Sequence, residues 1–427
     1  MRPNLVESLI LGLAPIVFFS GCSLLPGQTA RGPGNRAFIT YWPPAENSNQ
    51  LKLAVKDNID MKGVITTAGS QYLARNSPPA AQDASCLAIA RKRNVQIVGK
   101  ANLSEFALAP SGFNEYFGTP KSPLSGWRKL IPGGSSCGSA VAVASGLADV
   151  AFGTDTAGSV RVPAACCGVV GLKTTHGLVP IDGVVPIEPE HLDTIGPLGK
   201  DIAHTVQGMD LLQDGFAARY AAATTVKPAG GDIRIGRLTL KGTDPKIDQA
   251  LDQALAKAGF QVVQLDDAFA TKWEQAKKDG NTLAAAGAWM SDRKYRFNLG
   301  ISGRTKSAIL AGRIAYNAGY AGAVARRSAW QNTLRQVFKK VDFIALPTIQ
   351  STPPPIPPNF RIGGLEVLVL KLQNTVAVSF AGNPALAMPI PLRHSAVRVT
   401  SLQLVGAPRS EAELLNAGRL VEAAVKL

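Results

Sequence analysis

From Leu51 onward, short apolar runs typical of strands alternate with longer segments typical of helices. The run LKLAVKD (51–57) has a strand pattern, DASCLAIARKRN (83–94) a helical one, and VQIVGK (95–100) a strand pattern again. Strands that alternate with helices usually share one sheet and are covered by those helices. The sequence therefore predicts an α/β fold.

The alternation continues through the rest of the chain. Helix is predicted over 138–147, 201–215 and the first part of 244–266, and strand over 149–155, 168–175, 232–240 and the last part of 244–266. Residues 273–338 are mostly helical in pattern, whereas the proline-rich stretch TPPPIPPNF (352–360) is predicted to be a loop, because proline cannot join the centre of a sheet.

Length and composition indicate one large folded unit. The chain has 427 residues, of which 46% are hydrophobic and 18% charged, and no low-complexity linker divides it. This composition supplies a sizeable core and argues against disorder outside the ends. Residues 50–427 are therefore predicted to form a single domain.

The N-terminal residues have the pattern of a bacterial export signal. Arg2 precedes an apolar run at 9–19, which is followed by Ser20, Gly21 and Cys22. The run has the length of a secretory signal and is shorter than the about 20 residues needed to span a bilayer. The ending F-S-G-C resembles a lipobox, so we expect a signal peptide over 1–21 and a lipid on Cys22, with an uncleaved anchor as the alternative.

Residues 22–49 are rich in proline, glycine and polar side chains and are predicted to be a flexible tether. On this hypothesis the protein is exported to the periplasm or the cell surface and held at a membrane through Cys22. Which membrane holds it is not predicted.

The chain is strongly basic, with a formal net charge of +15. Such a surface can attract anionic lipid or nucleic acid. Aromatic and basic residues do not interleave as they do in a nucleic-acid-binding groove, however. We therefore expect a solvated basic surface and no nucleic-acid partner.

No metal or cofactor site is predicted. The four histidines share no short ligand spacing, and no neighbouring cysteine or acidic cluster completes a zinc site. An oxidising compartment would permit a disulfide, but the sequence assigns none. These residues are His176, His191, His204 and His394, and Cys86, Cys137, Cys166 and Cys167.

The stretch 133–164 is rich in serine and glycine but contains no histidine. Within it, G-S-S-C-G fits the G-x-S-x-G nucleophile elbow with Ser136 as the nucleophile. That motif requires an apolar strand before the serine, and here Pro132 and a glycine pair precede it. A serine nucleophile in this stretch therefore needs a base from elsewhere in the chain.

A lysine can serve as that base if it is kept neutral. Burial disfavours the ammonium form and brings the pKa of a lysine towards about 7–8, where it can accept a proton. Lys56 follows an apolar strand pattern in LAVKDNID (53–60). A surface lysine at the end of a strand is the alternative.

These segments together resemble the amidase signature family. The resemblance covers the chain from about Leu51 to its end and depends on a long, ordered set of motifs. They are LAVKDNID (53–60), VGKANLSEF (98–106), GGSSCGSAVAVA (133–144), GTDTAGSVRVPA (153–164), GVVGLK (168–173), ALPT (345–348) and AGNPALAMP (381–389). The resemblance implies the amidase signature fold, a mixed central β-sheet covered by helices on both faces.

The resemblance also implies a Ser-cisSer-Lys triad. Lys56 matches the base, Ser135 the bridging serine with a cis peptide bond, and Ser159 the nucleophile. The backbone amides of Thr156, Ala157, Gly158 and Ser159 match the oxyanion loop of the family.

Three positions depart from the common family pattern. Cys137 stands where glycine is usual, Ala157 replaces the first glycine of T-G-G-S, and Thr174 replaces the proline of L-K-P-T. None of these changes removes a member of the implied triad. Cys137 is expected either to narrow the site or to pair with another cysteine.

The function implied by the resemblance is hydrolysis of a carboxamide in a small molecule or peptide, without a cofactor. One alternative is the glutaminase subunit of a tRNA-dependent amidotransferase, which shares the motifs. Another is a lipid-anchored binding protein whose triad is idle. Neither the substrate nor the oligomeric state is predicted.

Overall fold

The structure is a computed structural model that describes residues 36–45, 48–126, 129–357 and 362–426. The predicted signal peptide and the predicted lipidation site, Cys22, lie outside the described residues.

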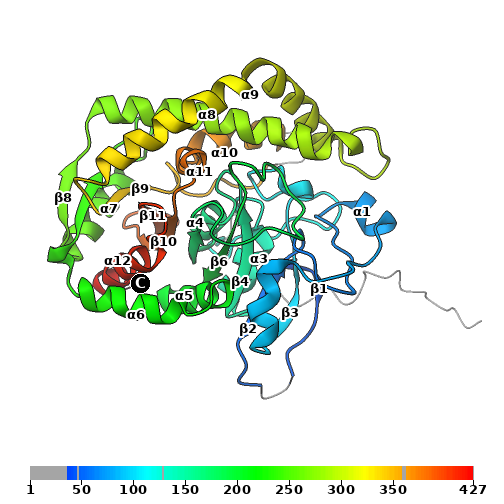
Figure 1. Cartoon of the computed structure of the whole chain (residues 1–427), viewed down its shortest axis with the longest axis horizontal. Helices are drawn as coiled ribbons and strands as arrows, with labels where there is room; N and C mark the ends of the chain where they lie inside the picture. The colour runs from blue at the N-terminus through cyan, green and yellow to red at the C-terminus, as the bar shows by residue number, and fades with distance from the viewer. Residues whose placement is uncertain (1–35, 46–47, 127–128, 358–361, 427) are drawn as a thin grey trace, which may run out of the picture.

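The described chain folds around a sheet of 11 strands in the order β1-β3-β2-β4-β6-β5-β10-β11-β9-β7-β8 (Figure 1). Strand β2 pairs in parallel with β3 and β4, and β7 pairs in parallel with β8 and β9. The remaining pairs are antiparallel, so the sheet is mixed, as predicted. The strands are β1 (Phe38–Tyr41), β2 (Lys52–Lys56), β3 (Gln96–Ala101), β4 (Val150–Asp155), β5 (Val170–Lys173), β6 (Thr194–Gly199), β7 (Arg234–Arg237), β8 (Gln261–Gln264), β9 (Phe343–Pro347), β10 (Ala385–Pro391) and β11 (Val399–Val405).

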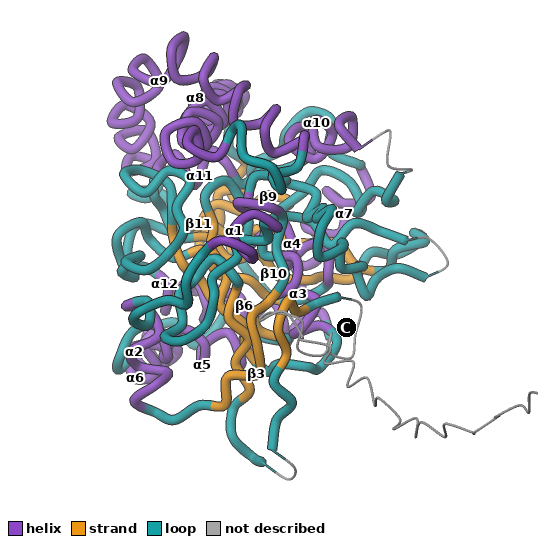
Figure 2. The backbone as a smooth tube through the Cα atoms, turned by 90° about the vertical axis from the view of Figure 1, so that its right-hand side faces the viewer, coloured by secondary structure: helices purple, strands orange, loops and turns teal. Residues whose placement is uncertain are grey.

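Helices cover both faces of this sheet (Figures 1 and 2). Helices α5, α7 and α12 pack on one face, and α3, α4, α8, α9 and α11 on the other. The helices are α1 (Gln71–Asn76), α2 (Ala88–Lys92), α3 (Cys137–Ala144), α4 (Arg161–Cys167), α5 (Ile202–Leu212), α6 (Phe216–Val226), α7 (Pro245–Lys257), α8 (Asp267–Asp292), α9 (Gly303–Val337), α10 (Ile362–Leu372), α11 (Val376–Ala381) and α12 (Glu411–Val425).

The period-two pattern of β2 accounts for the two layers. Leu53 and Val55 lie in the core beneath α5 and α12, while Ala54, between them, lies in the core beneath α3 and α4. Successive side chains of a strand point to opposite faces, so a strand buried on both faces is apolar throughout. The small side chain of Ala54 allows α3 to pack close to β2.

The alternation of strand and helix predicted from the sequence is confirmed from β2 to α9. Strand β1 differs from the prediction, because it lies within the predicted tether over 22–49. It pairs with β3, with Tyr41 opposite Gly99. The sheet therefore begins before the predicted domain boundary at residue 50.

Among the described helices, none combines the length and the apolarity needed to cross a bilayer.

A buried ion pair fixes the turn between β4 and α4. Arg161 and Asp155 are both fully buried, and the guanidinium donates two hydrogen bonds to the carboxylate at 2.9 and 3.0 Å. Arg161 also donates to the Thr375 carbonyl, to Gln403 and to Ser379. The pair thereby joins the turn after β4 to α11 and β11. Burial alone would raise the pKa of Asp155, but the charge and hydrogen bonds of Arg161 hold it below its usual value.

The substitution Asp155→Asn is expected to lower the free energy of unfolding by about 3–5 kcal/mol, because it leaves the buried Arg161 charge uncompensated. Asp83→Asn is the control, since Asp83 pairs with Arg91 at the surface and its loss should cost less than about 1 kcal/mol. Chemical denaturation of both variants measures the difference. Equal stability of the two would contradict the structural role of the buried pair.

Candidate active site

The site lies where β2 and β4 end on the same edge of the sheet. These strands are parallel neighbours, with Val55 opposite Phe152, so their carboxyl ends meet. Lys56 is the last residue of β2, and the turn containing Ser159 follows β4. Ser135 lies in the glycine-rich turn before α3, which packs on β2 and β4. Three segments far apart in sequence thus bring the three predicted residues together.

The ammonium group of Lys56 is surrounded by hydroxyl and carbonyl oxygens. Its Nζ lies 2.7 Å from Ser135 Oγ and 2.7 Å from Thr154 Oγ1. Asn58 Nδ2 donates to the same Thr154 oxygen at 3.1 Å. Since no carboxylate contacts Lys56 among the described residues, nothing in direct contact compensates a positive charge there.

Ser159 contacts the turn that carries Ser135. The backbone N–H of Ser135 donates to Ser159 Oγ at 3.2 Å, and the N–H of Ser136 donates to the Ser159 carbonyl at 3.2 Å. Ser159 is half-buried, whereas Ser135 is 1% exposed and Lys56 is fully buried. The three side chains therefore lead from the surface into the interior.

Two details differ from what the family resemblance implies. Every described peptide bond is trans, so the expected cis bond before Ser135 is not found. Among the described hydrogen bonds, none joins the hydroxyls of Ser135 and Ser159 directly; the contact runs through the Ser135 backbone N–H.

Burial lowers the pKa of Lys56 from its usual value to about 7, although Asp155 and other nearby acidic groups act in the opposite direction. Burial also lowers the pKa of Lys173 to about 7, aided by the charge of Arg161. Lys173, however, donates only to the carbonyls of Thr174 and Asn383. Only the first of these two lysines contacts a serine of the candidate site.

The loop over 156–159 presents unused backbone donors. No hydrogen bond within the described chain uses the N–H of any of its four residues, which is unusual for a buried segment. Gly158 adopts a φ of +139°, a region that favours glycine, and a Cβ there would lie 2.2 Å from Thr375 Oγ1. Ala157 stays outside the positive-φ region, so alanine in place of the usual glycine does not strain this loop.

Side chains outside the predicted set hold this loop in place. Thr375 Oγ1 donates to the Ala157 carbonyl at 2.6 Å, and Thr156 Oγ1 donates to Asp193 at 2.6 Å. Burial raises the pKa of Asp193 to about 6. Sequence reasoning missed Thr154, Asp193 and Thr375. Thr154 lies inside a quoted motif, but Asp193 and Thr375 carry no signal in the sequence, because only the fold brings them near.

The nucleophile-elbow alternative is not supported. Ser136 is fully buried, and its hydroxyl donates to the Thr154 carbonyl at 3.1 Å. Ser139 donates to the Phe152 carbonyl in the same way. Both serines attach α3 to β4. Neither side chain caps the N-terminus of α3.

The two remaining family departures are both buried. Cys137 Sγ packs 3.4 Å from the Gly112 carbonyl, and burial raises the pKa of its thiol to about 12. The four described cysteines are free, so Cys137 forms no disulfide with them. Thr174 donates to the Ile195 carbonyl at 2.8 Å and so attaches the end of β5 to β6.

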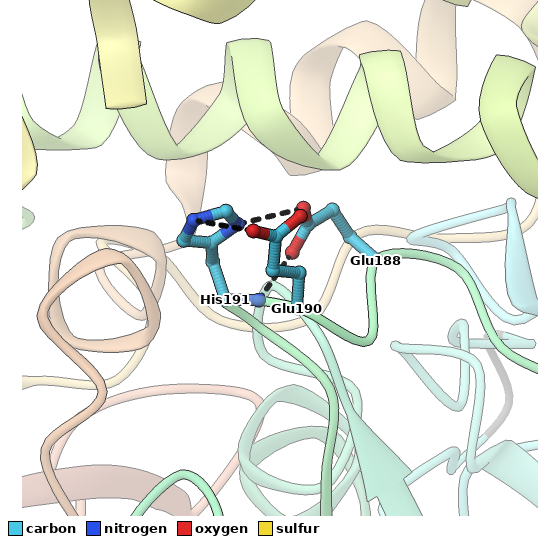
Figure 3. A group of neighbouring side chains, drawn as sticks. All are labelled: Glu188, Glu190 and His191. Atoms are coloured by element: carbon cyan, nitrogen blue, oxygen red, sulfur yellow. Dashed lines mark hydrogen bonds and ion pairs between the residues drawn. The ribbon is translucent and has the colours of Figure 1, made fainter. Parts of the chain in front are cut away.

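One acidic group was not predicted from the sequence. Ligand atoms of Glu188, Glu190 and His191 lie within 4.8 Å of one another (Figure 3). Hydrogen bonds already occupy the buried member, since Glu188 accepts from His191 Nδ1 at 3.0 Å, from the His191 N–H and from the Tyr320 hydroxyl. These contacts account for the group as an internal hydrogen-bond network.

Comparisons with known proteins identify the family of the chain. A family model described as Amidase matches residues 51–415. The A subunit of the glutamyl-tRNA(Gln) amidotransferase of Natronomonas pharaonis is 34% identical over 412 residues, which cover 86% of this chain and 94% of that relative. The 2-amino-5-chloromuconic acid deaminase of Comamonas testosteroni is 32% identical, over 88% of this chain and 81% of that enzyme.

The fold is also shared with solved structures. A crystal structure described as an amidase superimposes with a TM-score of 0.73 at 27% identity, over 88% of this chain and 84% of the other. The family match spans the whole region that carries the candidate site. The chain therefore belongs to the amidase signature family and is a hydrolase of amide C–N bonds.

Proposed function

We propose that this enzyme hydrolyses a carboxamide to a carboxylate and ammonia or an amine, through an acyl-enzyme on Ser159. The observation that carries the proposal is the 2.7 Å contact between Lys56 Nζ and Ser135 Oγ, on a turn whose N–H contacts Ser159 Oγ at 3.2 Å. A buried amine, a bridging hydroxyl and an accessible hydroxyl are the groups that a serine-lysine relay needs.

In the first half-reaction, neutral Lys56 accepts the Ser135 proton while Ser135 accepts the Ser159 proton. Ser159 Oγ attacks the amide carbonyl. The proton held on Lys56 then returns through Ser135 to the leaving nitrogen, the C–N bond breaks, and the acyl group remains on Ser159. In the second half-reaction, water passes a proton along the same relay and attacks the ester, releasing the acid and restoring Ser159.

The relay requires the Ser135 hydroxyl to approach Ser159. In the described structure the Ser135 hydroxyl contacts Lys56. A small change in the turn at Ser135 on substrate binding would close the remaining gap, since catalytic hydrogen bonds often shorten only in the substrate complex.

The charge that develops on the carbonyl oxygen needs preorganised donors. The unused backbone N–H groups of the loop over 156–159 support an oxyanion role, because they need no rearrangement to bind a developing negative charge. Thr375 and Asp193 would act as positioning residues that fix this loop.

A second candidate function is that of a glutaminase subunit in a tRNA-dependent amidotransferase. The identity to the glutamyl-tRNA(Gln) amidotransferase of Natronomonas pharaonis favours it. Such a role would need cytosolic partners and tRNA, which the export-like N-terminus opposes. Glutamine is therefore included in the substrate panel, with peptide, aryl, fatty and urea-like amides. A third candidate, an idle binding protein, is tested by the same panel.

The proposed location is a bacterial membrane, with the enzyme attached through a lipid on Cys22. The support is the pattern of Arg2, the apolar run at 9–19 and the lipobox-like ending at Cys22. Mass spectrometry of the protein from membranes tests it, since the N-terminal peptide should begin at an acylated Cys22. An intact Met1 would contradict this location and leave the amidase proposal untouched.

A fluorophosphonate probe should label the wild-type enzyme, and Ser159→Ala should abolish labelling and lower turnover at least about a thousandfold, because the nucleophile is lost. Ser136→Ala serves as the control, since that hydroxyl bonds to β4. Absence of labelling in the wild type, together with no hydrolysis of any amide in the panel, would favour the idle protein. Labelling that persists in Ser159→Ala would exclude Ser159 as the nucleophile.

The rate constant kcat/KM should rise about tenfold per pH unit below about pH 7 and level off above it, since Lys56 must be neutral to accept a proton. Lys56→Ala should remove the activity. His176→Ala should keep the profile, because His176 contacts only the Pro189 and Gly382 carbonyls. Lys173→Met should lower the stability of the protein but leave the pH midpoint of kcat/KM unchanged. A shift of the pH midpoint of kcat/KM in Lys173→Met would refute the assignment of Lys56 as the base.

The substitution Gly158→Ala should lower kcat about a hundredfold or more, because its Cβ would meet Thr375 Oγ1 at 2.2 Å and disturb the oxyanion donors. The matched control Ala157→Gly should change kcat less than about threefold, since the Ala157 backbone is unstrained. Steady-state kinetics at equal folded fraction distinguish the two. Similar kcat values in both variants would argue against a role for the loop geometry.

A further inference from the structure

The connection between α8 and α9 exposes large apolar side chains to solvent. We refer to residues 293–317, the connection and the first turns of α9, as the hairpin tip. Phe297 is 77% exposed and Leu299 89%, while Leu310 and Ile314 of α9 are 47% and 71% exposed. Single exposed apolar residues are ordinary, but a group of this size on one element marks an interaction surface.

On α9 these apolar residues alternate with cations on one face. Lys306, Leu310, Arg313 and Ile314 follow the i, i+4, i+7, i+8 spacing that places side chains on one side of a helix. The adjoining side of α9, which includes the buried residues Thr305, Ile309 and Gly312, packs against α8. The hairpin tip is thus amphipathic, with an unpartnered face that is both apolar and basic.

The charge of this region is of one sign. The hairpin tip contains Arg293, Lys294, Arg296, Arg304, Lys306 and Arg313, and no aspartate or glutamate occurs from residue 293 to residue 341. Among the described ion pairs, only Arg304 of these six is matched, by Glu115 and Glu366. A partner for this face must therefore supply negative charge as well as apolar contact.

Aromatic rings lie close to four of the six cations, namely Lys294, Arg296, Arg304 and Arg313. The guanidinium of Arg296 lies 4.5 Å from the ring centre of Phe297, and that of Arg313 lies 5.6 Å from the ring centre of Trp289. Cations at the rim of exposed Phe and Leu side chains are the pattern of helices that lie in the headgroup region of a bilayer.

The start of the described chain lies on the same side of the molecule. Asn102 Nδ2 donates to the carbonyls of both Arg36 and Gly118, which places these two residues side by side. Glu115, in the same loop as Gly118, pairs with Arg304 in the first turn of α9. A chain held at a membrane through residues before Arg36 would therefore bring the hairpin tip towards that membrane.

We infer that the hairpin tip docks on an anionic phospholipid surface. Phe297, Leu299, Leu310 and Ile314 enter the boundary between headgroups and acyl chains, and the unpaired arginines and lysines contact lipid phosphates. The inference rests on neither the amidase chemistry nor a lipid on Cys22, because docking by this face does not require them.

The test uses a chain that starts at residue 36 and therefore lacks Cys22. This chain keeps every strand of the sheet, every described core residue and the whole family match over 51–415, so it retains the complete folding unit. It is floated with vesicles of phosphatidylcholine, alone or mixed with phosphatidylglycerol in equal parts. It should float with the anionic vesicles, and raising the salt concentration should weaken this association.

The combined variant Phe297→Ser, Leu299→Ser and Ile314→Ser should lower the partition coefficient at least about tenfold. The matched control is Val226→Ser, since Val226 is 76% exposed at the end of α6, a helix that lies far from α8 and α9 in Figure 1. Circular dichroism and fluorophosphonate labelling verify that each variant is folded.

Several outcomes would overturn the inference. One is the absence of flotation for the wild-type chain; another is an equal loss in the combined and Val226 variants. Binding to neutral vesicles that is insensitive to salt would refute the role of the cations. If the same substitutions instead dissociate a dimer observed without vesicles, the face binds a second copy of this chain.

Discussion

The burial of Lys56 is the constraint around which the rest of the site is arranged. An amine in the interior is tolerated only if it is neutral or fully hydrogen-bonded, because the interior cannot solvate its charge. Here its nearest neighbours are the oxygens of Ser135 and Thr154 and no carboxylate. The fold therefore produces a basic group near neutral pH without a histidine, by excluding water from the end of β2.

Two buried carboxylates near Lys56 are paired with other cations and do not contact its amine. Lys100 lies near Lys56 in the sheet, and its Nζ forms an ion pair with Asp57 Oδ1 at 2.8 Å. Arg161 forms an ion pair with Asp155. Asp57 and Asp155 thus each have their own cation. Were either carboxylate free to contact Lys56, the ammonium form would be stabilised and the base lost.

The sequence predicted most strands and helices from β2 to α9, though not, for example, β6 or α1, and it predicted the three residues of the proposed relay, because each of these has a local pattern or a family motif. It did not predict β1, whose four residues lie in a segment otherwise typical of a linker, and which is a strand only because β3 offers a free edge. Asp193 and Thr375 could not be predicted either. Their contacts with the loop over 156–159 are long-range, and no spacing in the sequence encodes them.

The connectivity of the sheet has a consequence for the rate of folding. Strand β5 pairs with β10, with Gly171 opposite Ala387. This part of the sheet can therefore form only after more than 200 residues of intervening chain have been made and brought together. The loop that carries Ser159 likewise needs the hydrogen bond from Thr375, which is distant in sequence, to reach its final position. Such long-range pairings fold slowly, since much chain entropy is lost before the contacts form. The candidate site should therefore be among the last parts of the chain to form during folding, and a partly folded chain would not yet hold Ser159 in the arrangement seen in the structure.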